Sequence, residues 1–185
     1  MNAPIDIQGV ILHTSRLTLR PWRHSDLQDF YEYACVDGVG QMAGWTPHKD
    51  IEESKGILEH FIEGKCDFAL EYQGKVIGSL GIKEYSEESY PELSHLSGRE
   101  IGYVLSKAYW GQGLMPEAVE AVTAYLLDAA GLDFVLVGHF DWNKQSARVI
   151  EKCGFQYIKT RPYETRRGTT ETALEYIRCG NVRDK

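Results

Sequence analysis

The segment Tyr109–Ala118 (YWGQGLMPEA) has residue types and a spacing that could do chemistry. It joins a short apolar stretch to a long stretch with helical periodicity. A turn that opens a helix gathers free backbone N–H groups at the positive end of the helix dipole, where phosphate oxygens can bind. Gly111 and Gly113 have no Cβ, so a phosphate could approach the backbone closely. The segment is neither a Walker loop nor the dinucleotide motif GxGxxG, and a plain turn remains the alternative.

A second polar segment, Asp141–Phe155, follows the next predicted strand. Its Asn143 can cap a short helix by accepting a hydrogen bond from the first turn. Ser146, three residues later, could donate a proton to a reacting group, or it could only stabilise that first turn. Arg148 and the neighbouring lysines could neutralise a phosphate, although such side chains are more often solvated surface charges.

Two titratable residues in predicted strands could move a proton. Glu100 alternates with Ile101 and Tyr103, so its carboxylate should point to the opposite face of the sheet from those side chains. His139 is the rival, because the ordinary pKa of histidine, about 6.5, suits proton transfer near neutral pH. The ordinary readings stay open: a solvated Glu100 paired with Arg99, and a structural His139 bonded to a neighbouring strand.

Strands and helices must hold these residues in place, and the hydrophobic pattern predicts one alternating α/β unit. Seven strands are expected over residues 12–22, 68–72, 76–82, 100–105, 134–140, 155–165 and 170–178. Four helices are expected: one capped by Ser25 or Asp26, one capped by Asp50, a long one over about 114–130, and a short one after Asn143. No repeat or linker-like segment interrupts this order, so residues 1–185 are expected to form one domain with its core at about 10–180.

Composition excludes several classes of function. The net charge is −7, and duplex DNA or an anionic membrane would require a surplus of Lys and Arg. The sequence has no apolar run of membrane-spanning length and no signal-like start, so we expect no membrane partner and a cytoplasmic location. The four cysteines form no CxxC pair and the six histidines no HExxH motif, so no metal site is expected.

Together with the order of elements, the two polar segments resemble the acyl-CoA-binding half of the GNAT N-acetyltransferases, in particular the RimJ/RimL-like branch. The opening Leu12–Arg20 and the segment Gly44–His48 are similar to the same branch. Met115 departs from the family pattern, because Gly or Ala is usual there and its side chain could narrow the pyrophosphate turn. The matching residues are Trp110, Gly111, Gly113, Asn143, Ser146, Gly154 and Phe155.

The resemblance implies a single-domain α/β (α+β) fold with a mixed, mostly antiparallel sheet of six to seven strands. About four helices would flank the sheet, and two central strands would splay apart to admit acetyl-CoA as co-substrate. The residues implied in acetyl-CoA binding are Tyr103, Val104, Leu105, Trp110, Gly111, Gln112, Gly113, Leu114, Met115, Asn143, Ser146 and Arg148.

The implied activity is transfer of an acetyl group to a primary amine, a protein N-terminus or a small amine, by direct attack in a ternary complex. Glu100 or His139 would remove the proton from the amine, and Ser146 would protonate the departing thiolate. Trp45 and His48 would lie on the acceptor side. A non-catalytic acyl-CoA sensor or interaction module is the main alternative, and an unrelated phosphate- or nucleotide-binding enzyme is a third. A homodimer through the terminal strands is also conceivable.

Overall fold

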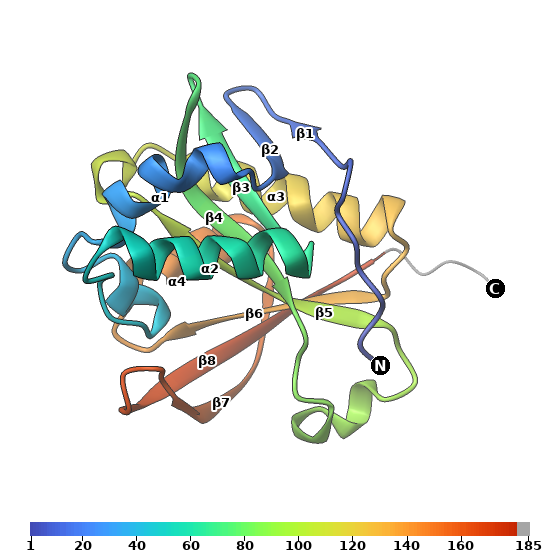
Figure 1. Cartoon of the computed structure of the whole chain (residues 1–185). Helices are drawn as coiled ribbons and strands as arrows, with labels where there is room; N and C mark the ends of the chain where they lie inside the picture. The colour runs from blue at the N-terminus through green and yellow to red at the C-terminus, as the bar shows by residue number, and fades with distance from the viewer. Residues whose placement is uncertain (181–185) are drawn as a thin grey trace.

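The computed structural model describes residues 1–180, which form one eight-stranded mixed sheet and four α-helices (Figure 1). The strand order is β1-β2-β3-β4-β5-β6-β8-β7, and every neighbouring pair is antiparallel except the parallel pair β5–β6. The strands are β1 (Leu12–His13), β2 (Leu17–Pro21), β3 (Asp67–Tyr72), β4 (Lys75–Lys83), β5 (Gly98–Leu105), β6 (Phe134–Phe140), β7 (Gln156–Glu164) and β8 (Thr170–Cys179). The helices are α1 (Leu27–Ala34), α2 (Ile51–Gly64), α3 (Leu114–Ala124) and α4 (Lys144–Lys152).

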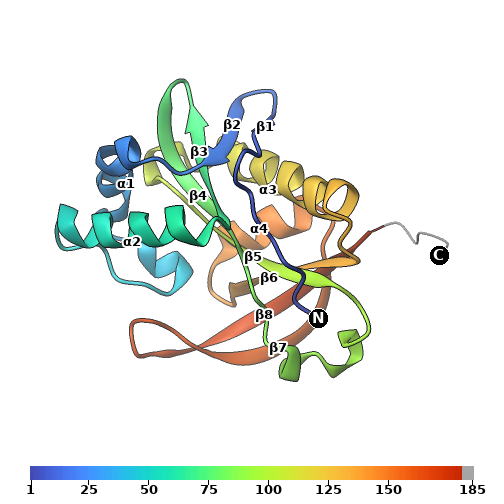
Figure 2. The ribbon, with the colours of Figure 1, turned by 45° about the vertical axis from the view of Figure 1, so that its right-hand side comes forward.

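The helices cover the sheet in two layers. α1 and α2 lie side by side over one face, and α3 and α4 lie over the other, as both ribbon views show (Figures 1 and 2). Alternation along the strands divides the apolar side chains between these layers: Ile101 and Leu105 pack with α3, whereas Val104 packs with residues of α1 and α2. Burial of apolar area on both faces is the main stabilising term for such a sheet.

The sheet has one strand more than the six to seven expected. Residues 12–22 were predicted as one strand, but the chain reverses at Thr14, whose N–H donates to Leu17 O at 3.0 Å. The Thr14 hydroxyl also accepts from Leu17 N at 2.8 Å, and this tight turn divides the segment into β1 and β2. The other six predicted strands are confirmed, and Gln73 and Gly74, both with positive φ, form the expected hairpin turn between β3 and β4. Residues 181–185 of the predicted single domain lie outside the described part.

The helix caps follow the sequence in two of three places. The side chain of Asp50 accepts a hydrogen bond from Glu53 N at 2.9 Å, and that of Asn143 accepts from Ser146 N at 3.1 Å. Asp26 stands before α1 but its side chain does not cap the helix. Its carboxylate instead accepts from both terminal nitrogens of the buried Arg20, at 2.8 and 2.9 Å, because a buried guanidinium needs a charged partner.

The helix predicted over 114–130 is present but changes its form. α3 is regular to Ala124, and the chain then continues as one π-helical turn over Tyr125–Ala129. Ala130 N donates to Tyr125 O at 2.8 Å, which is an i→i+5 bond. The helical run ends at Gly131, whose φ of 74° is the expected left-handed stop.

The parallel strands β5 and β6 pair only over their first halves. Residues 98–101 of β5 pair with 134–137 of β6. Beyond this point residues 102–105 pair only with β4, and residues 138–140 pair only with β8. The predicted splay between two central strands is therefore present, and it opens the middle of the sheet.

Residues 1–180 include neither a membrane-spanning helix nor a cluster of metal ligands. None of the helices in this range is both long enough and apolar enough to cross a membrane. Within the same range, no group of three or more His, Cys, Asp or Glu residues is arranged to hold a metal ion.

Candidate functional site

A cavity of about 600 Å³ runs through the opening between β5 and β6. This volume is in the range of small-molecule sites. Most of the site residues predicted from the sequence line it, and two do not: Gln112 and His48. The predicted residues that line it are Trp45, Glu100, Tyr103, Val104, Leu105, Trp110, Gly111, Gly113, Leu114, Met115, His139, Asn143, Ser146 and Arg148.

The turn before α3 presents a row of free backbone donors. Gly111 and Gly113 have φ values of 75° and 76°, a conformation that favours glycine. Within residues 1–180, none of the N–H groups of Gly111–Gly113 donates a hydrogen bond, and α3 has no side-chain N-cap. Leu114 and Met115 begin the helix, where N–H groups have no partner within it. A Cβ built on Gly111 would meet nothing within 4 Å, so the space beside the turn is open, and the turn fits a pyrophosphate.

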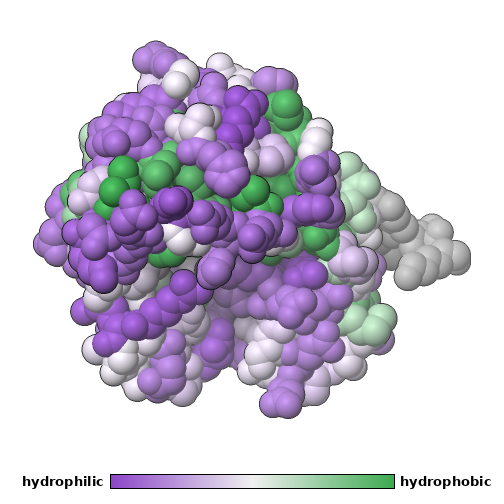
Figure 3. All heavy atoms as spheres, in the orientation of Figure 1, coloured by the Kyte–Doolittle hydropathy of each residue, from purple (hydrophilic) through white to green (hydrophobic). Residues whose placement is uncertain are grey.

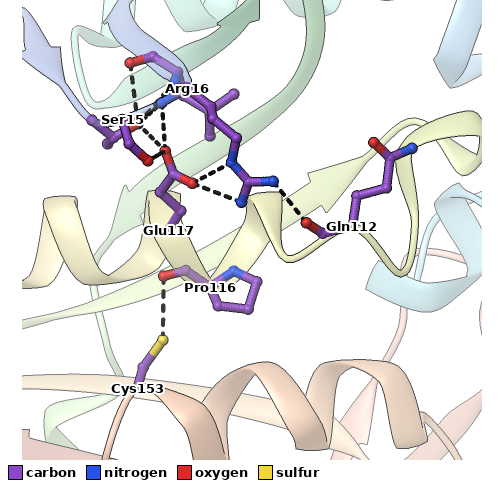
Figure 4. Close-up of polar contacts among 8 residues, drawn as sticks. Ser15, Arg16, Gln112, Pro116, Glu117 and Cys153 are labelled. Atoms are coloured by element: carbon purple, nitrogen blue, oxygen red, sulfur yellow. Dashed lines mark hydrogen bonds and ion pairs between the residues drawn. The ribbon is translucent and has the colours of Figure 1, made fainter.

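Three contacts fix this turn. The indole of Trp110 donates to Leu105 O at 2.8 Å and so ties the turn to the end of β5. Arg16, from the turn before β2, donates to Gln112 O at 2.9 Å. The same guanidinium forms an ion pair with Glu117 in the first turns of α3, at 2.7 Å (Figure 4). Gln112 thus does not line the cavity, and Arg16, to which the sequence assigned no role, binds its carbonyl oxygen.

Met115 lies where α3 begins and is 5 % exposed. Its side chain belongs to the apolar core under α3 and also lines the cavity. The residue that departs from the family pattern is therefore held by core packing beside the donor row.

Ser146 and Tyr103 form a hydroxyl pair at the cavity wall. Tyr103 Oη lies 2.7 Å from Ser146 Oγ, and either atom can donate. Tyr103 comes from β5 and Ser146 from the first turn of α4, so the pair spans the opening. Burial raises the pKa of the Tyr103 phenol, which keeps it protonated near neutral pH. The hydroxyl of Tyr103 was not predicted as part of the site.

Asn143 connects the two sides of the cavity. Its amide oxygen caps α4, and its amide nitrogen donates to Met42 O at 3.1 Å. Met42 belongs to the short 3₁₀ segment Gly40–Ala43, which precedes the Trp45 loop. The capping residue of α4 therefore also positions the loop expected on the acceptor side.

Glu100 lines the cavity from the face of β5 that carries Val104, as the strand alternation predicted. Burial, and next the negative charge of Glu175, raise the pKa of the Glu100 carboxyl. Arg99 lies on the other face, where its Nη1 is 3.5 Å from Glu84, so it does not pair with Glu100. A half-buried carboxylate with a raised pKa is suited to accept a proton near neutral pH.

His139 lines the cavity with both ring nitrogens engaged. Nδ1 lies 2.8 Å from Phe140 O, and Nε2 lies 3.2 Å from the hydroxyl of Tyr176 on β8. A carbonyl only accepts, so Nδ1 carries a proton, and Nε2 shares a hydrogen bond with the Tyr176 hydroxyl. The ring also stacks on Tyr176, with centroids 5.4 Å apart. This geometry matches the alternative stated above, a structural His139 that is hydrogen-bonded to a neighbouring strand, here β8.

Trp45 lines the cavity and His48 lies behind it. Gly40 lies directly under the Trp45 ring, where a Cβ would overlap the indole. His48 is buried, with Nδ1 2.7 Å from the hydroxyl of Ser54 on α2 and its ring 5.1 Å from that of Trp45. Burial lowers the pKa of His48. Trp45, which was predicted on the acceptor side, therefore contacts the cavity, whereas His48, predicted with it, packs behind the Trp45 ring in the protein interior.

Charged residues that the sequence did not single out line the other half of the cavity. They include Asp67 on β3, Lys83 on β4 and Glu175 on β8. Burial raises the pKa of Asp67 to about 6. The signal that could have located them is a glycine inside each of three neighbouring strands, Gly81, Gly102 and Gly138, since a strand glycine often marks a close approach.

Comparison with known proteins places this architecture. The family described as "Acetyltransferase (GNAT) domain" matches residues 16–156. The probable N-acetyltransferase YjcK of Bacillus subtilis is 44% identical over 132 residues, which are 71% of this chain and 70% of YjcK.

Solved structures share the fold. The GNAT-family acetyltransferase from Bacillus anthracis has a TM-score of 0.79 and 19% identity, over 92% of this chain and 98% of its own. The microcin C7 self-immunity acetyltransferase MccE, solved in complex with acetyl-CoA and AMP, has a TM-score of 0.75 and 16% identity, over 89% of this chain and 93% of its own. At such identities the likeness shows the fold alone.

Proposed function

The chain belongs to the GNAT acetyltransferase family, and from this premise we propose that it transfers the acetyl group of acetyl-CoA to a primary amine by direct attack in a ternary complex. The acceptor class is a protein N-terminus or a small amine, and the similarity of the polar segments to the RimJ/RimL-like branch supports that choice. The free thiols of Cys35, Cys66, Cys153 and Cys179 are compatible with the cytoplasmic location that we also propose.

The observation that carries the proposal is the donor row at Gly111–Met115 beside the opening between β5 and β6. These N–H groups would hold the pyrophosphate, and Arg148 and Lys152, which also line the cavity, would add positive charge. Acetyl-CoA supplies a thioester whose carbonyl carbon is open to attack. Those N–H groups of residues 102–105 that point towards β6 would bind the pantetheine and the carbonyl oxygen on which negative charge develops.

On the acceptor side, Glu100 would take the proton from the amine. An alkylamine has a pKa of about 10 and is mostly protonated at neutral pH, so its nitrogen cannot attack until a proton leaves. Because its pKa is raised, the Glu100 carboxylate is a stronger base than an ordinary glutamate and can better accept the proton of the amine. We prefer Glu100 to His139 because both ring nitrogens of His139 already have hydrogen-bond partners, Phe140 O and the hydroxyl of Tyr176.

On the donor side, Ser146 would protonate the departing thiolate. Its hydroxyl shares a hydrogen bond with the Tyr103 hydroxyl at 2.7 Å, so the phenol could replace a proton that Ser146 gives up. The Asn143 side chain positions Ser146 by accepting a hydrogen bond from Ser146 N at the start of α4.

Binding and turnover test the proposal. Calorimetry should detect CoA and acetyl-CoA, and an acceptor panel followed by free-thiol release should identify at least one amine that is acetylated. Binding of CoA without turnover of any amine would instead favour the acyl-CoA sensor. Binding of ATP in place of CoA would favour a nucleotide-binding enzyme. Light scattering would test the homodimer that we propose through the terminal strands.

A further inference from the structure

Three glycines lie in a row across the sheet at the level of the splay. Gly81 on β4 pairs with Gly102 on β5, and Gly138 on β6 is the first residue after the last β5–β6 pair. At these three positions, on the sheet face towards α1 and α2, the strands contribute no side chain of their own to the cavity floor. The acetyl group would emerge between Gly102 and Gly138, because these two residues border the opening.

A charged side chain from the neighbouring strand leans over each glycine. A Cβ on Gly102 would lie 2.9 Å from Lys83 Nζ, and a Cβ on Gly138 would lie 2.9 Å from Glu175 Oε2. Asp67 lies still closer over Gly81. The glycines thus leave room for ionic groups on the sheet face that α1 and α2 cover. Of the three groups only Glu175 is fully buried, and a buried charge is costly unless it is paired.

Glu175 has one carboxylate oxygen that receives no hydrogen bond from residues 1–180. The residue is 2 % exposed, and its side chain lines the cavity. Arg161 on β7 forms an ion pair with Oε1 at 2.8 Å. Within residues 1–180, Oε2 has no hydrogen-bond partner. A buried, unpaired carboxylate oxygen costs stability, and such an oxygen next to an open site points to a donor that arrives with a ligand.

We infer that Glu175 Oε2 binds the ammonium group of the acceptor, and that the acceptor is a primary amine without a carboxylate on the nitrogen-bearing carbon. The inference rests on the proposed function and names the substrate class for the same site. Figure 3 shows that the surface below α2 is hollowed and mainly hydrophilic around the hollow.

Two carboxylates then share the work on one nitrogen. Glu175 lies beside the opening, because it pairs with Gly138. Glu100 lies two residues before Gly102 on β5, so its side chain is on the same face of the sheet but one step from the opening. Arg161 occupies only Oε1 of Glu175, so Oε2 is left to hold the ammonium, while Glu100, whose pKa is raised by burial, is suited to remove its proton. An α-carboxylate on the acceptor would lie within a few bonds of both carboxylates. Because Arg161 is already paired with Glu175 and Lys83 lies over the neighbouring glycine, Gly102, the α-carboxylate would meet the two carboxylates first and would be repelled.

Steady-state kinetics with L-alaninamide, n-pentylamine and L-alanine test the inference. Alaninamide stands for a protein N-terminus, pentylamine for a small amine, and alanine carries the excluded carboxylate. In Glu175→Gln, KM for alaninamide and pentylamine should rise at least about tenfold while kcat changes less, because the lost contact holds the amine before and during reaction. The ratio of kcat/KM for alaninamide to that for alanine should also fall towards one.

Gly138→Ala is a second variant that keeps the carboxylate. Its Cβ would fill the space next to Glu175 Oε2, so it should raise KM for both amines in the same way. Glu63→Gln is the matched control, because Glu63 is exposed on α2 and does not line the cavity. Unchanged KM values in both Glu175→Gln and Gly138→Ala would overturn the inference and leave the proposed transferase activity intact.

A binding experiment separates this inference from the proposed function. Calorimetry of alaninamide and pentylamine against protein saturated with CoA requires no turnover. Binding that is lost in Glu175→Gln supports the inference even where no acetyl transfer is found, and the proposed transfer alone then fails. Wild-type protein that neither binds nor acetylates either amine overturns the inference, whether or not CoA binds.

Discussion

Arg16 and Glu117 form an ion pair that fastens the turn before β2 to the first turns of α3, with Arg16 Nη2 2.7 Å from Glu117 Oε2 (Figure 4). The same guanidinium holds Gln112 O at 2.9 Å, inside the turn that presents the donor row. The other carboxylate oxygen of Glu117 accepts from the hydroxyls of Thr14 and Ser15 and from Arg16 N. A contact that lies outside the cavity therefore sets the shape of the turn that would bind the pyrophosphate.

Replacing Arg16 should weaken CoA binding more than it weakens the fold. Arg16→Met leaves Gln112 O without its donor, so we expect the Kd for CoA to rise about five- to tenfold, as for loss of one charge-assisted hydrogen bond that positions a site. The cost in stability should be about 1 kcal/mol or less, because the Arg16 side chain is 41% exposed. Calorimetry with CoA and urea unfolding measure the two effects.

Lys75→Met is the control for Arg16→Met. It breaks an exposed ion pair with Glu32, at 2.6 Å, on a part of the sheet that does not line the cavity. It should leave the Kd for CoA unchanged. Equal CoA affinity in Arg16→Met and in wild type would refute the positioning role of Arg16.

Acid should remove the contribution of Glu117 to stability. Its hydrogen bonds and Arg16 lower the pKa of this carboxyl to about 2 in the folded protein, below its value in the unfolded chain. The folded state therefore binds fewer protons, and the stabilisation is complete above pH of about 4.5 and declines as pH falls towards 2. Urea unfolding between pH 6 and pH 3 should show a steeper loss of stability for wild type than for Glu117→Gln. Parallel curves would mean that Glu117 gains no stability from its ionised form.

Glu100→Gln should remove general-base catalysis. We expect kcat to fall by about 10²-fold or more. In wild type, kcat should fall as pH drops through a value above the ordinary pKa of glutamate, because burial and Glu175 raise the pKa of Glu100 and only its ionised form accepts a proton. That acidic limb should vanish in Glu100→Gln and remain in His139→Gln. A limb that disappears with His139 instead would exchange the two roles.

Ser146→Ala and Tyr103→Phe should each lower kcat about tenfold or more, because the hydroxyls act as one proton-donating pair at 2.7 Å. The double variant should then lose little more than the worse single variant, since residues that act as a unit are not additive. Single-turnover acetyl transfer with a fixed acceptor measures all four proteins. Losses that multiply in the double variant would show that the hydroxyls act separately.

Local patterns carried most of the fold. Asp50 and Asn143 were predicted as helix caps and accept the expected bonds, because a cap joins residues only three positions apart. The strand around Glu100 was predicted by alternation, which also decides the face of the sheet to which Glu100 points. The prediction failed for the carboxylate of Asp26, because the buried Arg20 claims it.

The rest of the site joins residues far apart in the chain. Ser146 and Tyr103 are 43 residues apart, and Arg16 and Glu117 are 101 residues apart. From the local sequence alone, Ser146 looks like a serine in the first turn of a helix, Tyr103 like a strand residue, and Arg16 and Glu117 like surface charges. A local sequence pattern does not predict the order of the strands in the sheet, and in this protein that order determines which of these distant residues come into contact.

By itself, the sequence determined the glycine turn before a helix, the capped helix that carries Ser146, and the α/β order that connects them. These are short-range consequences of backbone freedom, capping and hydrophobic period. Only the tertiary structure decided that β6 lies between β5 and β8, which brings Glu175 to Gly138 at the edge of the opening. The physical reason is that burial and charge pairing depend on the whole sheet. Arg161 on β7 pairs with Oε1 of Glu175, whereas Oε2 lies over Gly138, where β5 separates from β6.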